Sequence, residues 1–182
     1  MKWRNSIANY GALSVGFHWV MVALLAAVYA CMELRGYFPK GNASRDLLKN
    51  LHFMLGLSVL VLAATRLVIN LVDRAPGITP APPGWQKFSA RAMHYALYAL
   101  MLGLPLLGWL LLSASGKPIP FFGTTLPALL GENKDTADLI KEVHETGATV
   151  GYFLIGFHAV AALFHHHVMR DDTLRRMLPR RQ

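Results

Sequence analysis

Four histidines of this 182-residue sequence, His18, His52, His144 and His158, fall in or beside apolar stretches, where polar side chains are costly and usually functional. His144 and His158 are fourteen residues apart. On an α-helix this spacing is a rise of about 21 Å and a rotation about 40° short of four full turns. Both side chains would therefore lie on one helix face, toward opposite ends. Because neutral imidazole is a common metal ligand, the spacing indicates ligand positions at two depths.

The elements that would position these histidines are four apolar segments of about 20 residues each. They cover residues 12–32, 51–72, 92–115 and 142–169. A helix of about 20 residues crosses the roughly 30 Å hydrocarbon layer of a membrane. Because lipid cannot hydrogen-bond the backbone, helices are the expected form. The sequence therefore predicts an all-α fold, with one four-helix transmembrane bundle forming a single domain over residues 1–182.

Composition agrees with a membrane protein and excludes several other classes. Hydrophobic residues make up 54% of the chain and charged residues only 15%, against about 25% in ordinary soluble domains. The single cysteine, Cys31, excludes a disulfide within the chain. The net charge is +8, but the basic residues flank the apolar segments and no nucleic-acid motif is found. Nucleic acid is therefore not an expected partner.

The basic residues are distributed unevenly about the apolar segments, which predicts the orientation of the chain. The side with the N-terminus, the 73–87 connection and the C-terminus would carry eleven basic and three acidic residues, and the other side seven of each. Both termini are therefore expected in the cytoplasm. The eleven basic residues are Lys2, Arg4, Arg66, Arg74, Lys87, Arg91, Arg170, Arg175, Arg176, Arg180 and Arg181.

With this orientation the histidines fall into two pairs at matched depths. His18 and His158 would lie near the cytoplasmic surface, and His52 and His144 near the external surface. Two imidazoles facing each other across a bundle are a ligand set for haem iron. Zinc would require four ligands, commonly including cysteine or carboxylate. We therefore expect two haems, with His18/His158 and His52/His144 as the axial pairs.

Basic side chains near each level would pair with haem propionates. Arg66 lies fourteen residues after His52, so it shares the face of His52 but sits at the cytoplasmic level. An intramembrane arginine without an anionic partner would be costly. Arg35, Lys49 and Lys141 lie near the external level, where ordinary juxtamembrane anchoring is the alternative interpretation.

Further residues near the paired histidines leave alternatives open. Gly147 and Gly151 share the His144 face, and we expect them to leave room for a flat cofactor. His94 opens the third segment on the cytoplasmic side and would be able to replace His18 or His158 as a ligand. The run His165–His167 offers material for a tetrahedral site, so a metal transporter is a rival interpretation.

Three stretches of the sequence resemble the bacterial cytochrome b561 family, and more closely its small dihaem members known as superoxide oxidases. They are HETGATVGYFLIGFHAVAALFHH, CMELRGYFPKG and DDTLRRMLPRR. The resemblance implies an inner-membrane four-helix bundle with two haem b groups, ligated through His18, His52, His144 and His158. It also implies that superoxide gives an electron on the periplasmic side and that membrane ubiquinone is reduced. Three consecutive histidines stand here where the family pattern has two.

The resemblance leads to an expected route for electrons, with no side chain assigned as catalytic. Arg35, Lys117 or Lys141 would attract superoxide to the external haem, and the second haem would pass the electron on. His165, seven residues after His158, would bond the quinone or supply a proton, and Arg66 or Arg74 would stabilise the reduced anion.

The alternative functions are an electron-transfer subunit of a dehydrogenase or hydrogenase, a transporter, and a haem-free structural protein. A protein partner is possible but not required.

Overall fold

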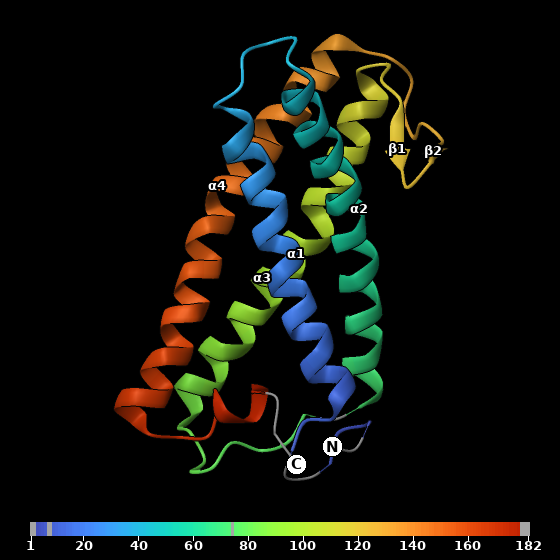
Figure 1. Ribbon diagram of the computed structural model, residues 1–182. Helices are drawn as coiled ribbons and strands as arrows, with labels where there is room; N and C mark the ends of the chain where they lie inside the picture. Colours follow the sequence, from blue (N-terminus) through green and yellow to red (C-terminus); the bar gives the residue numbers. More distant parts are fainter. Residues whose placement is uncertain (1–2, 7–8, 74, 179–182) are drawn as a thin grey trace.

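The computed structural model describes residues 3–6, 9–73 and 75–178, and within these ranges it is an antiparallel bundle of four long helices (Figure 1). The helices are α1 (Ala12–Arg35), α2 (Ala43–Val72), α3 (Gly84–Ala114) and α4 (Lys134–Phe164). Each is long and apolar enough to cross a membrane. Lys2, Arg74, Arg180 and Arg181, named above for orientation or quinone contact, lie outside the described residues.

The helices α2, α3 and α4 begin about eight residues before the apolar segments that predict them, and polar side chains cap two of the three, α2 and α4. The Asn42 side chain accepts a hydrogen bond from the backbone N–H of Ser44 at the start of α2. Asn133 does the same for Thr136 at the start of α4. Such caps satisfy backbone donors that the first helical turn leaves free. The added turns are polar and lie beyond the apolar stretch.

The two ends of the bundle differ (Figure 1). At one end, here called the His158 end, α1 begins, α4 ends and the connection between α2 and α3 passes. At the opposite end, called the His144 end, lie the connections 36–42 and 115–133.

A small hairpin at the His144 end departs from the all-α prediction. Strands β1 (Ile119–Phe121) and β2 (Thr124–Leu126) pair antiparallel, with Phe121 opposite Thr124. The two loop residues, Phe122 and Gly123, both have positive φ, of 44° and 86°, as a two-residue hairpin turn requires. Phe-Gly is not a typical signal for this turn, so the sequence did not indicate it. The buried Ile119 packs against α2 and α3 through Leu57 and Leu112.

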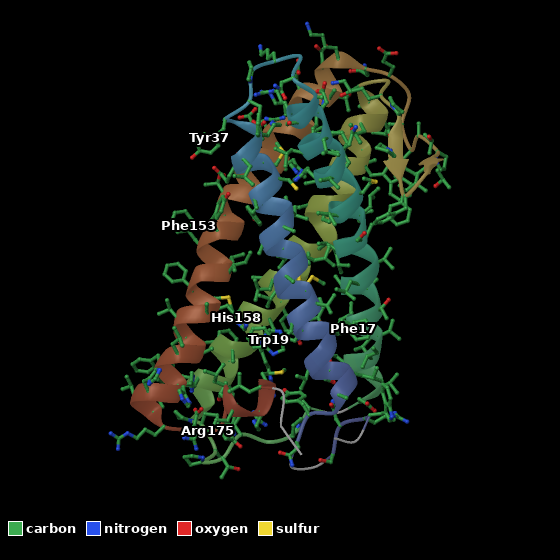
Figure 2. All side chains as sticks on the ribbon, in the orientation of Figure 1. Phe17, Trp19, Tyr37, Phe153, His158 and Arg175 are labelled. Carbon is green, nitrogen blue, oxygen red and sulfur yellow. The ribbon has the colours of Figure 1, made fainter. Side chains whose placement is uncertain are left out.

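The helices pack in sequence order, and α4 is held mainly by α3. Within the described part of the chain, the closest helix packing is α1 along α2, α2 along α3 and α3 along α4. Large apolar side chains such as Val68 and Phe153 are about 60% exposed. Figure 2 shows Phe153 pointing away from the bundle. In a membrane these faces would contact lipid. The inner core cluster consists of Met21, Val59, Ala63, Leu100 and Met101.

Two glycines of α4 have a different role from the one expected of them. A Cβ at Gly147 would lie 2.7 Å from Leu104 Cδ2. A Cβ at Gly151 would overlap the hydroxyl of Tyr29 and lie 2.8 Å from Leu100 Cδ1. The Tyr29 hydroxyl donates a hydrogen bond to the carbonyl of Ala148 at 2.9 Å. The expectation that these glycines make room for a cofactor is therefore wrong, because protein side chains from α1 and α3 fill the space.

Candidate cofactor-binding site

The structure brings the four histidines together in the two pairs expected from their depths. At the His144 end, the ring centroids of His52 and His144 are 6.3 Å apart, with an interplanar angle of 79°. Toward the His158 end, the centroids of His18 and His158 are 6.4 Å apart, with an interplanar angle of 71°. In each pair one histidine comes from α4 and the other from α1 or α2. These are helices that α4 does not pack along closely.

Both separations suit a single metal ion held between two rings. A metal–imidazole bond of about 2 Å on each side, with a ring radius of about 1 Å at each end, gives a centroid separation of roughly 6 Å. If the two imidazoles only stacked on each other or shared a hydrogen bond, nothing would require their centroids to be roughly 6 Å apart. Within the described residues, no group of three or more histidine, cysteine, aspartate or glutamate side chains is arranged to hold a metal ion. The geometry therefore fits a two-ligand metal and not a tetrahedral site.

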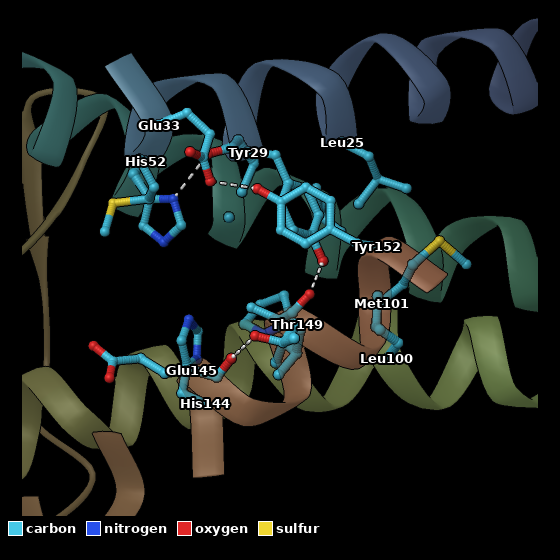
Figure 3. A pocket seen from close by; sticks show the side chains of 17 residues that line it. Leu25, Tyr29, Glu33, His52, Leu100, Met101, His144, Glu145, Thr149 and Tyr152 are labelled. Atoms are coloured by element: carbon cyan, nitrogen blue, oxygen red, sulfur yellow. Dashed lines mark hydrogen bonds between the residues drawn. The ribbon is translucent and has the colours of Figure 1, made fainter. Parts of the chain in front are cut away.

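A cavity of about 240 Å³ opens beside the His52/His144 pair (Figure 3). His52 and His144 lie on opposite sides of it, and its walls come from all four helices. His52 Nδ1 lies 3.1 Å from the carbonyl oxygen of Val28. This bond requires Nδ1 to carry the hydrogen, so Nε2 keeps its lone pair for a metal. The His52 ring is thus held in the tautomer that ligation needs.

A glycine of α2 keeps the space beside these rings free of side chains. Gly56, one turn after His52, lines the cavity, and a Cβ built there would meet no atom within 4 Å. A flat macrocycle requires such a bare helix surface beside its ligands. Gly108 on α3 has a different role, because a Cβ there would lie 3.4 Å from Cε1 of His144, so this glycine makes room for the ligand ring itself. Gly56, and not Gly147 or Gly151, therefore has the surroundings that suit a haem.

The charged groups near this pair also suit a haem with its two carboxylates. Arg35 lies close enough to His52 to interact electrostatically, and its Nε is buried with no hydrogen-bond partner among the described residues. An unpartnered buried guanidinium nitrogen is costly, and a propionate would satisfy it. By contrast, Lys49 lies over the Phe53 ring at 5.8 Å, and Lys141 is 3.9 Å from Glu145. Arg35 is therefore the best propionate candidate of the three that the sequence indicated.

The pair toward the His158 end has a third histidine and an arginine beside it. The His94 ring centroid is 5.5 Å from that of His158, so His94 is a close neighbour of the predicted ligand. This distance and the 6.4 Å between His18 and His158 both lie within about 0.5 Å of the roughly 6 Å that a shared metal requires, so the distances leave His18 and His94 as candidates for the opposite ligand. His18 Nδ1 is buried without a partner in the described part of the chain. Arg66 acts electrostatically on all three histidines.

Arg66 has the surroundings expected of a propionate partner. The hydroxyl groups of Tyr98 and Tyr10 lie within electrostatic reach of it, and it forms no ion pair with a carboxylate among the described residues. An intramembrane guanidinium without an anion is unfavourable. A haem carboxylate would remove that cost and would fix the haem orientation.

We expect Arg66→Ala to lower the midpoint potential of the haem at the His158 end. Removing a positive charge destabilises the reduced haem by about 1–2 kcal/mol at an effective dielectric constant of 20, which is on the order of 50 mV. Redox titration of the purified variant checks this. Arg91→Ala is the matched control, since Arg91 is an exposed arginine of α3. An unchanged potential in Arg66→Ala would end the propionate assignment.

The structure also shows polar pairs that sequence reasoning missed. Tyr152, on α4, donates a hydrogen bond of 2.6 Å to Glu33 of α1 at the edge of the cavity (Figure 3). At the other end, His165 Nδ1 lies 2.5 Å from Oδ2 of the buried Asp171. Neither pair follows a helical spacing that a sequence pattern reveals. Both depend on how separate segments meet.

Comparison with known proteins agrees with this arrangement. The model of the family described as prokaryotic cytochrome b561 matches residues 9–180. The chain is 44% identical to cytochrome b561 homolog 1 of Escherichia coli (strain K12), over 96% of this chain and 99% of the relative. It is 36% identical to the probable superoxide oxidase CybB of Yersinia pestis, over 96% and 98%. It is 30% identical to cytochrome b561 homolog 2 of the same E. coli strain, over 98% and 95%.

These matches cover almost the whole chain, and the residues present fit the cofactor that the family binds. Facing imidazoles, a bare glycine surface, a cavity and an arginine with a buried, unpartnered Nε suit a haem b site. Four long apolar helices account for its place in a membrane. The chain therefore belongs to the prokaryotic cytochrome b561 family, whose members are multi-pass membrane proteins that bind b-type haem and transfer electrons.

Proposed function

We propose that this protein carries two haem b groups and moves electrons across the inner membrane, from superoxide on the outside to ubiquinone. The observation that carries the proposal is the presence of two facing imidazole pairs at two depths of one bundle. His52 and His144 hold one haem, and His18 and His158 hold the other. The helix rise of about 21 Å between His144 and His158 spaces the two sites across much of the hydrocarbon layer.

Bound haem supplies the one-electron chemistry, and the side chains hold it and control its surroundings. The imidazole pairs fix its position, Arg35 and Arg66 bind its carboxylates, and the apolar helices exclude water. The cavity has Glu33 and Glu145 on its lining, and each has a partner, Tyr152 for Glu33 and Lys141 for Glu145. With Arg35 bound to a haem carboxylate and Lys141 paired with Glu145, the exposed Lys117 is the residue of the three that attracts an anion such as superoxide to this end.

The His158 end is the cytoplasmic end in this proposal, so both termini are cytoplasmic. The sequence assigns its excess of basic residues to the membrane side that holds both termini, and such an excess favours the cytoplasmic side. It also places His165 beyond His158, near the internal haem and the surface. Ubiquinone binds there, with His165 bonding a carbonyl oxygen.

The test uses purified, haem-loaded protein in detergent with a steady enzymatic source of superoxide and a short-chain ubiquinone. We expect superoxide to reduce the haem and added quinone to reoxidise it, and we expect superoxide dismutase to abolish the reduction. Absorbance of the reduced haem follows both steps. Haem that stays oxidised in the presence of superoxide would contradict the proposal.

A second candidate is a quinone-reactive electron-transfer subunit of a dehydrogenase or hydrogenase. The 44% identical E. coli relative is named only as a cytochrome b561 homolog, a name that agrees with either function. It predicts that haem reduction depends on a protein partner. The same experiment separates the two, because only a superoxide oxidase reduces quinone without a partner.

A further inference from the structure

At the His158 end, the chain after α4 folds back over the bundle and brings a carboxylate next to His165. A π-helical turn, η1 (His165–Met169), follows α4 directly, and Arg170 then adopts a left-handed conformation with φ 54°. This reversal brings Asp171 back against the residue that opened the turn. The backbone N–H of Asp171 donates to the carbonyl of His165 at 3.1 Å, and its Oδ2 lies 2.5 Å from His165 Nδ1.

The carboxylate of Asp171 is buried and its oxygens are both engaged. The residue is 7% exposed, whereas the His165 side chain is 21% exposed. Oδ1 of Asp171 accepts a hydrogen bond of 2.9 Å from the backbone N–H of Thr173. Burial raises the pKa of Asp171, but the hydrogen bonds from His165 and Thr173 outweigh it and hold the pKa below its usual value. Asp171 therefore stays ionised at neutral pH.

The segment that carries Asp171 is anchored by other residues. Asp172 Oδ1 accepts from the backbone N–H of Thr79 at 3.0 Å, and Arg176 donates to the carbonyls of Pro76 and Gly77 at 2.8 Å each. Trp19 Nε1 donates to the carbonyl of Met177 at 2.7 Å. In the described part of its own segment, the Asp171 side chain accepts only the bond from Thr173 given above, and the bonds that join the segment to the rest of the bundle come from Asp172, Arg176 and Met177. The bond of Asp171 outside its own segment is the one to His165.

A buried carboxylate that accepts a hydrogen bond from Nδ1 of an imidazole has two effects on the ring. It keeps a hydrogen on Nδ1 and fixes the ring plane, and its negative charge stabilises the ring when Nε2 also carries a proton. Nε2 of His165 is then the nitrogen free to act. We propose that Asp171 is a positioning residue that prepares His165 to deliver a proton to the quinone, an inference that rests on the function proposed above.

Reduction of one ubiquinone to ubiquinol takes up two electrons and two protons. Each electron arrives singly, as the one-electron chemistry of haem requires. At the carbonyl oxygen that His165 bonds, the Nε2–H bond of the protonated ring breaks and an O–H bond forms on the quinone. The second carbonyl oxygen takes its proton from water at the cytoplasmic surface. The neutral ring then takes a proton from water at the cytoplasmic surface. Asp171 remains ionised throughout.

The test compares Asp171→Asn with Asp172→Asn in the purified, haem-loaded protein, with short-chain ubiquinone as acceptor. We expect Asp171→Asn to lower kcat for quinone reduction by about 10- to 100-fold, with KM changed less than about threefold. Haem content and the rate of haem reduction by superoxide should match those of the wild type. Asp172→Asn disturbs the anchoring loop but not the His165 bond, so its kcat should fall by less than about threefold.

A double-variant cycle with His165→Gln tests whether Asp171 acts through His165. We expect Asp171→Asn to have almost no further effect once His165 is replaced, because the group it orients is gone. Additive losses, equal losses in the two aspartate variants, an unchanged kcat, or loss of haem from Asp171→Asn would each overturn the positioning role. If the wild type itself fails to pass electrons to quinone, the proposed function fails and the inference fails with it. Wild-type activity with an unaffected Asp171→Asn refutes the inference alone.

Discussion

His144→Ala is expected to lose one haem per chain and to keep the other. His144 faces His52 across the cavity at one end of the bundle, while His18 and His158 lie together toward the other end. Removing one of two axial imidazoles leaves the haem held by a single ligand in a site built for two. The haem content of the purified protein should therefore fall from about two to about one per chain. The pyridine haemochrome spectrum measures this ratio.

The matched variant, His158→Ala, should lose the haem at the opposite end. The two variants are then distinguishable, because each keeps a haem with a different midpoint potential and a different response to Arg66→Ala. His52→Ala should behave like His144→Ala, and His18→Ala like His158→Ala. Variants of both ends that keep the same haem would contradict the two-pair arrangement. Haem loss in His94→Ala but not in His18→Ala would reassign the ligand opposite His158.

Gly56→Phe is expected to exclude the haem at the His144 end while leaving the bundle folded. Gly56 lines the cavity between His52 and His144, and a Cβ there meets no protein atom within 4 Å. An aromatic ring at this position would therefore occupy the space of the cofactor without displacing the helices. Haem content should fall to about one per chain, as in His144→Ala, although all four histidines remain. Haem content and helical circular dichroism together measure the effect.

Gly156→Phe provides the matched control for this substitution. Gly156 lies on the exposed face of α4, a Cβ there also meets no atom within 4 Å, and it does not line the cavity. The same ring added there should leave the haem content unchanged. Equal haem content in Gly56→Phe and the wild type would mean that the macrocycle does not lie against this part of α2.

The positions of the paired histidines could be predicted from the sequence because helix geometry alone determines them. Fourteen residues are almost four turns, so His144 and His158 share a face whatever surrounds them. The alternating direction of the four apolar helices then sets the depth of His18 and His52. The same reasoning placed Arg66 at the level of His18 and His158, and in the structure it lies close enough to His18, His94 and His158 to interact with them electrostatically.

Features that depend on contacts between helices could not be predicted in this way. Gly147 and Gly151 looked like space for a cofactor, but α1 and α3 fill that space with Tyr29, Leu100 and Leu104. The Asp171–His165 pair needs a π-helical turn and a left-handed residue, neither of which has a clear sequence signal here. Only the tertiary structure shows which glycines face a ligand and which face a neighbouring side chain.

The haem-to-chain ratio of the full-length wild-type protein, produced with ample iron and porphyrin supply, tests the central claim most directly. Two pairs of facing imidazoles predict a ratio of about two, with b-type spectra and two resolvable midpoint potentials. A ratio of one would mean that one of the pairs does not bind haem. A colourless protein would contradict the whole account.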